Sequence, residues 1–275
     1  MRLPEGSERP ASGKETVMRY TQERAAILHI EEIAPGIHNV VLSAKTIASA
    51  ASAGQFVQVL CEPYQLRRPI SIAGFDPGLG ILRLIFEVRG KGTAYLAGCR
   101  KGESLDLIGP LGHGFPLEDA SKKAVLVGGG IGTPPLLPPA QFYGANATVI
   151  TGFRTASAAI LQGDFAAAGA ETVLCTDDGS AGFHGFTTQA LEQRLARGDV
   201  DVVYTCGPKV MMKGVAKLAE TAGAVCYVSM EERMGCGVGA CLGCTCKTKN
   251  EQGETQMTRV CLNGPVFRST EVDWT

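Results

Sequence analysis

Two different patterns of hydrophobic and polar positions divide the chain near residue 120. Before that point, short segments rich in β-branched residues are separated by turns of Gly, Pro and Asp. Short strands at such close spacing are typical of a small antiparallel barrel. We therefore predict an all-β domain at residues 19–119, with strands near residues 25–30, 38–42, 55–60, 70–72, 81–88 and 104–108.

After residue 120, apolar strands alternate with helical patterns. Such alternation predicts a parallel sheet with helices on both faces. The expected strands lie at residues 123–127, 148–151, 171–175, 202–206 and 224–229, the last being the final strand of the sheet, and the expected helices near 135–143, 187–197 and 209–222. The predicted fold is thus a β-barrel plus an α/β domain at residues 120–229, followed by a small C-terminal domain at residues 230–275.

Length and charge narrow the classes of function. The chain has 275 residues, which suffices for about two domains and a small appendage. Its net charge is −1, so we expect no nucleic-acid partner. No apolar run reaches the roughly 18 residues of a membrane span. Residues 1–18 are polar and lack the apolar core of a signal peptide, so we expect a disordered leader and a cytoplasmic protein.

Cysteines gather near the C-terminus at an informative spacing. Cys236, Cys241 and Cys244 are followed by Cys261, which matches the C-x4-C-x2-C…C pattern of a plant-type [2Fe–2S] centre. Small residues between the cysteines allow a tight loop whose amide groups point at sulfur. We therefore predict these four cysteines as ligands of a [2Fe–2S] cluster, although Cys246 is an alternative to Cys244 or Cys261.

Three different roles for these cysteines fit the sequence less well. A disulfide knot requires an oxidising compartment, for which the sequence has no signal. A zinc ribbon uses two C-x2-C pairs, but Cys261 has no such partner. Buried cysteines without a function do not account for five within so short a span.

Two motifs in the first half fit phosphate binding. Arg68 and Ser71, in Arg-Pro-Ile-Ser at a predicted strand start, can approach a diphosphate by charge and by hydroxyl. Gly92 and Thr93 stand at a predicted helix start, where amide groups favour phosphate. Arg68 alone is equally compatible with an ordinary surface position. His113, in a later Gly-Pro-Leu-Gly-His-Gly-Phe loop, is expected to be structural, as are His29 and His38.

The second half opens with a glycine-rich turn between a strand and a helix. Gly128, Gly130 and Gly132 form this turn, but Thr133 occupies the third glycine position of the G-x-G-x-x-G fingerprint. Further on, Cys206, Gly207 and Pro208 follow a predicted strand, and Cys206 is alternatively a buried thiol at a strand end. Arg154, near the end of another strand, is expected to be an ion-pair partner.

Together, these motifs resemble the ferredoxin–NADP reductase superfamily over about residues 20–229. The resemblance implies a barrel that binds FAD and an α/β domain that binds a pyridine nucleotide. Cys206 then lies near the nicotinamide. Asp177 and Asp178 stand where NADP-binding members have Ser-Arg, which favours NAD. The implied FAD contacts are Arg68, Pro69, Ile70, Ser71, Ile85, Phe86, Glu87, Gly92 and Thr93, and the implied nucleotide contacts are Gly128, Gly130, Gly132, Asp177, Asp178, Cys206, Gly207 and Pro208.

With the cysteine segment included, the chain resembles the electron-transfer subunits of NAD-linked (type B) dihydroorotate dehydrogenase. The resemblance implies a partner subunit containing FMN that oxidises dihydroorotate in pyrimidine synthesis, within a heterotetramer of two copies of each subunit. Electrons then pass through the cluster and FAD to NAD⁺, which is a substrate. Asn263 departs from the acid expected there, and the loop between Cys244 and Cys261 is long.

Two other functions remain open at this point. One is a cluster-bearing NAD(P)H reductase subunit of another complex, of the sulfhydrogenase or sulfite reductase type. The other is a zinc-stabilised regulatory module that binds a nucleotide.

Overall fold

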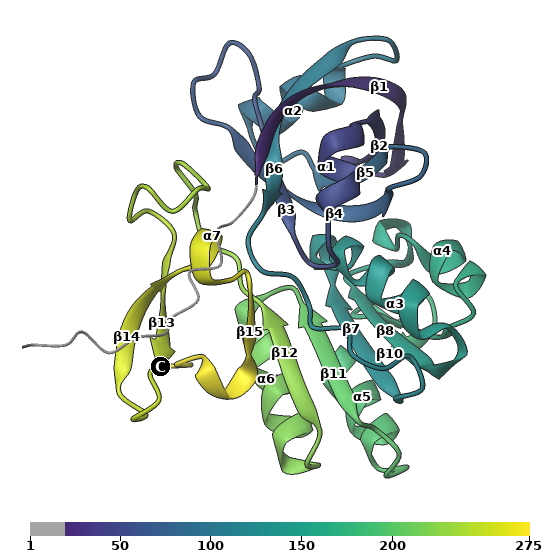
Figure 1. Cartoon of the computed structure of the whole chain (residues 1–275). Helices are drawn as coiled ribbons and strands as arrows, with labels where there is room; N and C mark the ends of the chain where they lie inside the picture. The colour runs from purple at the N-terminus through teal and green to yellow at the C-terminus, as the bar shows by residue number, and fades with distance from the viewer. Residues whose placement is uncertain (1–19) are drawn as a thin grey trace, which may run out of the picture.

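The computed structural model describes residues 20–275, so the leader predicted at residues 1–18 lies outside the described residues. The chain forms a closed barrel, a seven-stranded sheet and a C-terminal segment beside that sheet (Figure 1). The predicted fold class is therefore confirmed. The exact domain limits remain predictions.

The barrel is antiparallel and closes in the order β1-β2-β5-β4-β3-β6. Alternating side chains fill it: Val57, Val59 and Leu107 are fully buried inside. Its strands are β1 (Thr21–Ala34), β2 (Ile37–Ser43), β3 (Phe56–Val59), β4 (Arg68–Asp76), β5 (Ile81–Glu87) and β6 (Ser104–Leu111). Two short helices, α1 (Lys45–Ala50) and α2 (Lys91–Gly98), lie in its connections.

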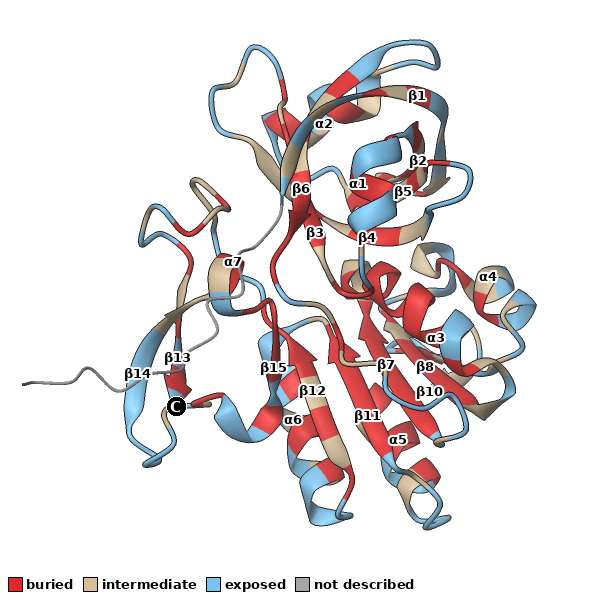
Figure 2. Cartoon of the chain, viewed as in Figure 1, coloured by how far each residue is buried: buried red, intermediate tan, exposed pale blue. Residues whose placement is uncertain are grey.

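The sheet has the order β10-β9-β8-β7-β11-β12-β15. Its central strands are buried on both faces, as Figure 2 shows by their red colour, which is usual for parallel strands. The strands are β7 (Ala124–Gly129), β8 (Ala147–Phe153), β9 (Glu171–Thr176), β10 (Phe183–His184), β11 (Val202–Cys206), β12 (Val225–Ser229) and β15 (Val266–Arg268).

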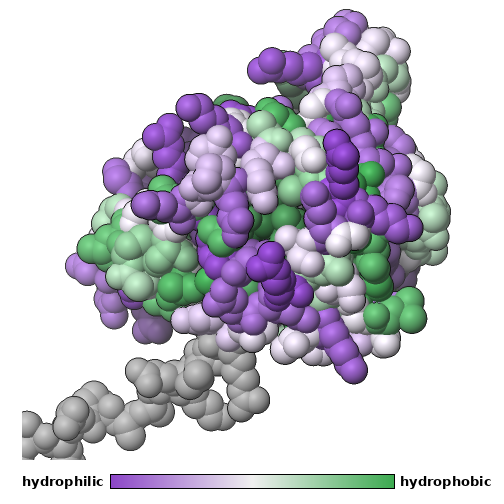
Figure 3. Space-filling model, turned by 90° about the horizontal axis from the view of Figure 1, so that it is seen from above, coloured by the Kyte–Doolittle hydropathy of each residue, from purple (hydrophilic) through white to green (hydrophobic). Residues whose placement is uncertain are grey.

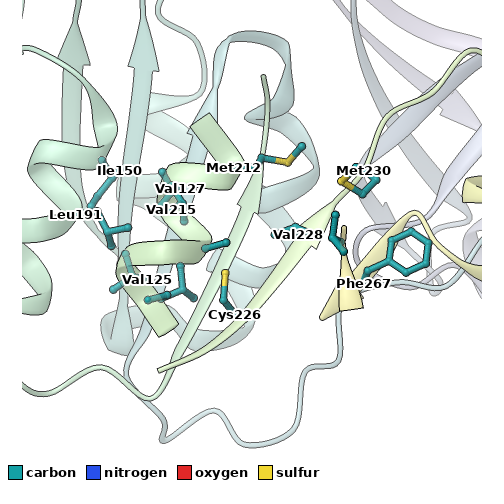
Figure 4. Close-up of a cluster of buried hydrophobic side chains, with 14 of the residues drawn as sticks. Val125, Val127, Ile150, Leu191, Met212, Val215, Cys226, Val228, Met230 and Phe267 are labelled. Carbon is teal, nitrogen blue, oxygen red and sulfur yellow. The ribbon is translucent and has the colours of Figure 1, made fainter. Parts of the chain in front are cut away.

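Helices cover both faces of the sheet, as predicted. On one face, α5 (Thr187–Leu195) and α6 (Lys209–Thr221) pack on the strands. Leu191 and Val215 from these helices meet Val125 and Val127 of β7 (Figure 4). The opposite face is covered by α3 (Leu137–Tyr143), which follows short 3-10 turns at residues 130–132 and 134–136, and by α4 (Gln162–Ala167).

The C-terminal segment is joined to the sheet by backbone hydrogen bonds. It consists of a hairpin, β13 (Thr245–Lys249) and β14 (Thr255–Arg259), the short helix α7 (Val260–Asn263) and β15. β15 pairs antiparallel with β12, and Phe267 lies opposite Val228 (Figure 4). The prediction that residues 224–229 form the final strand was therefore wrong. β15 has only three residues, too few for a recognisable period.

Within residues 20–275, no helix is both long and apolar enough to cross a membrane.

Candidate functional sites

A cavity of about 960 Å³ lies between the barrel and the sheet. Glu87 and Arg89 line it from the barrel side, and the ends of β7, β8, β9 and β11 line it from the sheet. Ligands of open α/β sheets bind at the carboxyl ends of the strands, and a cavity of this size suits an extended cofactor.

The glycine-rich turn forms the floor of this cavity. Gly130 has a φ of 53° and Gly132 is pressed against β11, where a Cβ would lie 2.5 Å from the carbonyl oxygen of Cys206. Both glycines line the cavity, as does Gly129. Gly128 packs instead against Thr133, so it shapes the turn without facing the cavity. Only glycine allows this close approach of two backbones.

The two predicted ribose carboxylates lie in different surroundings. Asp177 lines the cavity, and its backbone N–H donates to the carbonyl of Phe153. Asp178 is not among the lining residues and accepts hydrogen bonds from the backbone N–H and hydroxyl of Ser180, at 2.9 and 2.6 Å. These bonds lower the pKa of Asp178. Asp177 is therefore the better placed of the two, although both roles stay predictions.

The residues of the Cys-Gly-Pro motif at the end of β11 also differ in whether they line the cavity. Gly207 and Pro208 line the cavity, whereas the thiol of Cys206 is buried behind them and only 1% of the residue is exposed. Burial raises the pKa of Cys206, and the nearby carboxylate of Glu231 adds to this effect. Cys206 is therefore a neutral thiol, and its predicted contact with the nicotinamide stays a prediction.

Several cavity residues were missed from the sequence. Arg154, expected as an ion-pair partner, lines the cavity and forms no ion pair within the described part of the chain. Lys209 directly follows Gly-Pro at the start of α6, a position that could have identified it. Glu231 lines the cavity just beyond β12, and desolvation raises the pKa of its carboxyl, with Arg89 opposing the shift.

A second predicted site lies where β4 meets the start of α2. Arg68 crosses this helix end so closely that a Cβ on Gly92 would lie 2.5 Å from Arg68 Nε. Neighbouring Arg67 is bound to the carboxylate of Asp106 at 2.9 Å, but Arg68 meets no carboxylate among residues 20–275. Its Nη1 donates to the carbonyl oxygens of Leu66 and Arg67, at 2.6 and 3.3 Å. A guanidinium without an acidic partner beside a helix N-terminus fits a diphosphate group.

The other predicted FAD contacts differ in how exposed they are and in whether they already form hydrogen bonds within the chain. Ser71 is half-buried at the barrel surface. The Thr93 hydroxyl accepts hydrogen bonds from the backbone N–H groups of Arg89 and Gly90 at 2.9 and 3.2 Å, so it already stabilises the helix start. Phe86 packs inside the barrel and Ile85 faces the second domain. Pro69 and Ile70 lie on β4, and Glu87 accepts from Arg89 at 2.6 Å.

The four predicted cysteine ligands come together as two pairs. The backbone N–H of Cys241 donates to Cys236 Sγ at 3.3 Å, and that of Cys261 donates to Cys244 Sγ at 3.5 Å. No three His, Cys, Asp or Glu side chains in the described residues converge on a single ion site. A [2Fe–2S] cluster is held by four thiolates, two on each iron, so pairing suits it better than convergence on one point.

The backbone around these pairs is also suited to a cluster. Gly235 and Gly243 lie against Cys241 Sγ, where an added Cβ would be 3.4 and 3.6 Å away. Burial alone would raise the pKa of Cys236, but backbone N–H groups of Cys241, Val238 and Ala240 lower it to about 7. For Cys261, burial and neighbouring Cys244 raise the pKa to about 12. A bound metal removes such a proton by its own charge.

The fifth cysteine, Cys246, lies on β13 opposite Thr258. It is 6% exposed and packs in the apolar core beneath the sheet. Burial raises its pKa to about 11. The strand position agrees with the predicted extended segment, while the choice between Cys246 and its neighbours as a ligand stays a prediction.

Comparison with known proteins places the chain in a family. The C-terminal residues 231–273 match the model of the iron–sulfur cluster binding domain of dihydroorotate dehydrogenase B. Dihydroorotate dehydrogenase B (NAD(+)), electron transfer subunit, of Geobacillus thermodenitrificans is 42% identical over 260 residues, covering 91% of this chain and 98% of the relative. The chain belongs to this family. The same subunit of Enterococcus faecalis is 38% identical and covers 93% of the chain and 99% of the relative.

Solved structures of other reductases have the same fold as this chain. The NADH-dependent reduced ferredoxin–NADP oxidoreductase studied for flavin-based electron bifurcation has a TM-score of 0.81 and 29% identity, covering 95% of this chain and 92% of that one. A cytochrome P450 reductase of Amycolatopsis, with a TM-score of 0.64 and 24% identity, covers 75% of this chain and 67% of that one and shares the fold. The predicted resemblances to the reductase superfamily and to the dehydrogenase subunits are thereby confirmed.

Proposed function

We propose that this chain carries electrons from a partner subunit with FMN, through a [2Fe–2S] cluster and FAD, to NAD⁺. As a family member it is the electron-transfer subunit of an NAD-linked dihydroorotate dehydrogenase. The observation that carries the proposal is the order of three sites in one compact chain. Paired cysteines pack beside the barrel, the barrel carries Arg68 over a helix start, and the cavity with Asp177 opens between barrel and sheet.

The overall reaction balances without a further reactant. Dihydroorotate loses two electrons and two protons on the partner and becomes orotate. NAD⁺ gains two electrons and one proton and becomes NADH, and the second proton is released. When bound, a flavin supplies the needed exchange between hydride chemistry and single-electron transfer to an iron–sulfur cluster.

Different residues of the chain would bind FAD, NAD and the cluster. Arg68 and the amides at the start of α2 would hold the FAD diphosphate, with Ser71 on the adjoining strand. Gly130, Gly132 and Gly207 would bring the backbone close to the NAD diphosphate, and Asp177 would accept from a ribose hydroxyl. A carboxylate at that place repels a 2′-phosphate, which supports NAD over NADP. The four paired cysteines would hold the cluster.

We also infer that the partner docks on the cysteine loop, residues 234–246. Leu242 is 74% exposed at its surface, although large apolar residues are normally covered. The C-terminal segment lies on the left in Figure 1. The left side of Figure 3, which views the molecule from above, shows hydrophobic residues among hydrophilic ones. Val238, by contrast, packs partly into the core. The FMN cofactor of the partner, the heterotetramer of two copies of each subunit and the cytoplasmic location remain part of this proposal.

The experiment compares two activities of the same preparation. The purified chain should contain FAD and iron and reduce artificial dyes with NADH, but it should oxidise dihydroorotate only after addition of the partner. Leu242→Asp should abolish most NAD-linked dihydroorotate oxidation and leave the dye activity intact. Leu79→Asp, at an equally exposed leucine in a barrel turn, is the matched control and should leave both activities intact.

Three outcomes would contradict the proposal. They are dihydroorotate oxidation by the chain alone, equal loss of both activities in Leu242→Asp, and a colourless protein containing zinc. The 29% identity to the NADH-dependent reduced ferredoxin–NADP oxidoreductase favours a second candidate, a reductase subunit of another complex. Purification with a partner other than a dihydroorotate-oxidising subunit would support that candidate.

A further inference from the structure

Gln58, in the middle of β3, is a fully buried polar residue between two of the proposed sites. Its neighbours Val57 and Val59 point into the barrel core. Because side chains alternate along a strand, Gln58 points out of the barrel. There it meets the cysteine loop: Gln58 Nε2 lies 4.0 Å from Met234 Sδ.

Gly237, the residue after Cys236, is shaped by this contact. It has a φ of 73°, and a Cβ at this position would lie 2.6 Å from Gln58 Cγ and 2.8 Å from Gln58 Cδ. The glutamine therefore packs directly on the backbone of the loop. Arg259 and Leu262 contact the same loop at Gly239.

The amide of Gln58 lacks an ordinary hydrogen-bond partner. Oε1 is buried and has none among the described residues, and Nε2 has only the weakly accepting thioether of Met234. A buried NH₂ donor whose sole acceptor is a thioether 4.0 Å away is unfavourable, so it points to a stronger acceptor supplied by a bound group. The sulfurs of an iron–sulfur site are hydrogen-bond acceptors, and the NH₂ end of the amide can turn towards them about its last side-chain bond.

Gln58 also connects the loop to the flavin strand. It lies directly opposite Pro69 of β4, between the positions opposite Arg68 and Ile70. One side chain therefore extends from the strand proposed to carry FAD to the residue beside a proposed cluster ligand.

We propose that Gln58 is a positioning residue that holds the cysteine loop against the flavin strand and donates a hydrogen bond from its amide to sulfur on the Cys236 side of the cluster. This inference rests on the proposed function, because it requires a cluster at the paired cysteines. A donor to sulfur stabilises the added negative charge of the reduced cluster and so raises its reduction potential.

The test measures cofactor content and the cluster potential of the FAD- and iron-loaded chain by spectroscopically monitored titration. Gln58→Leu keeps the volume and removes the amide. It should retain FAD and iron but shift the midpoint potential to more negative values. Gln58→Met also removes the amide and keeps an unbranched side chain, so it should shift the potential in the same direction.

Gln55→Leu is the matched control in the segment just before β3. Gln55 Nε2 donates to the carbonyl of Gly112 at 2.7 Å, away from the cysteine loop, so this variant should leave the potential unchanged. Loss of iron from Gln58→Leu with FAD retained, and with iron retained in Gln55→Leu, would also support the positioning role.

Wild-type potential in both Gln58 variants would overturn the inference and leave the proposed function intact. If Gln58→Leu does not fold, Gln58→Met decides by the same criterion. Absence of iron from the wild-type chain would instead overturn the proposed function itself.

Discussion

The cavity proposed for the nucleotide and the cysteine loop proposed for the cluster are built in opposite ways. The cavity is built from the ends of strands whose residues are buried on both faces, and its closest contacts involve backbone and glycine. The loop at residues 235–244 has no regular secondary structure, and its inner surface consists of cysteine side chains held by amide groups.

This difference indicates what keeps each site in an ordered conformation. The cavity is formed by the hydrophobic core of the sheet and should exist before any ligand binds. The loop has few apolar residues of its own, so its order should depend on the group that its cysteines bind. Changes in the loop should therefore remove a cofactor, whereas changes in the cavity should alter binding while leaving cofactors in place.

The largest effect is expected from the paired cysteines. Cys236→Ser, Cys241→Ser, Cys244→Ser and Cys261→Ser should each abolish iron binding while FAD is retained, because each removes a thiolate ligand. Iron and flavin assays on the purified variants measure both. Cys246→Ser is the control and should keep its iron. Iron lost from the Cys246 variant but kept in the Cys261 variant would reverse the ligand assignment.

The next effect concerns Gly132, where the backbone at the end of β11 leaves no room for a side chain. Gly132→Ala places a Cβ 2.5 Å from the carbonyl oxygen of Cys206, so the loop must move away from β11. A displacement of this kind should lower kcat/KM for NADH-to-dye reduction by about 10²-fold. Iron content should not change. Gly163→Ala, at an open helical position, is a suitable control.

A smaller effect separates the two aspartates. Asp177→Arg should shift the ratio of kcat/KM for NADPH over NADH upwards by about tenfold or more, since roughly 1.4 kcal/mol corresponds to a factor of ten. Attraction of the 2′-phosphate then replaces repulsion. Asp178→Arg should give a much weaker shift because Asp178 is bound to Ser180 outside the cavity. Equal shifts in the two variants would show that the cavity does not distinguish them.

The smallest effect is expected at Asp273, which lies beyond β15 and contacts the hairpin. Asp273 accepts from the Thr255 hydroxyl at 2.7 Å and from the backbone N–H of Thr275 at 3.0 Å, and these bonds lower its pKa to about 2. Because the folded pKa is lowered, this stabilisation is present at neutral pH and disappears as the pH falls from about 4 towards 2. Thermal unfolding should show a slightly lower Tm for Asp273→Asn at pH 6 and a smaller difference near pH 3. A constant difference over this range would contradict the assignment.

The sequence predicted elements well wherever a period or a spacing was long enough to observe. The strands of the barrel, the alternation after residue 120 and the helix start at Gly92 were all recognisable. The cysteine spacing also identified the iron–sulfur segment, which the family match confirms. Local patterns of this kind depend on residues that are close in the chain.

Features that depend on distant contacts could not be predicted. The two-residue strand β10 and the three-residue strand β15 have no period of their own and form only because longer strands offer free edges. Asp177 and Asp178 are adjacent in sequence, and only the turn around Ser180 shows that their side chains separate. Arg154 and Glu231 reach the cavity through the packing of whole strands, and Gln58 meets Gly237 across 179 residues of sequence.

The pairing of β15 with β12 has a consequence for the engineering of this chain. A reductase cut after Ser229 would expose the backbone groups of β12 as a bare edge, which readily recruits strands from other molecules. The C-terminal extension therefore also covers this edge of the sheet. A shortened flavin reductase made from this chain would need another cover for β12, such as a charged or proline-bearing strand in place of residues 266–268, to prevent pairing at this edge.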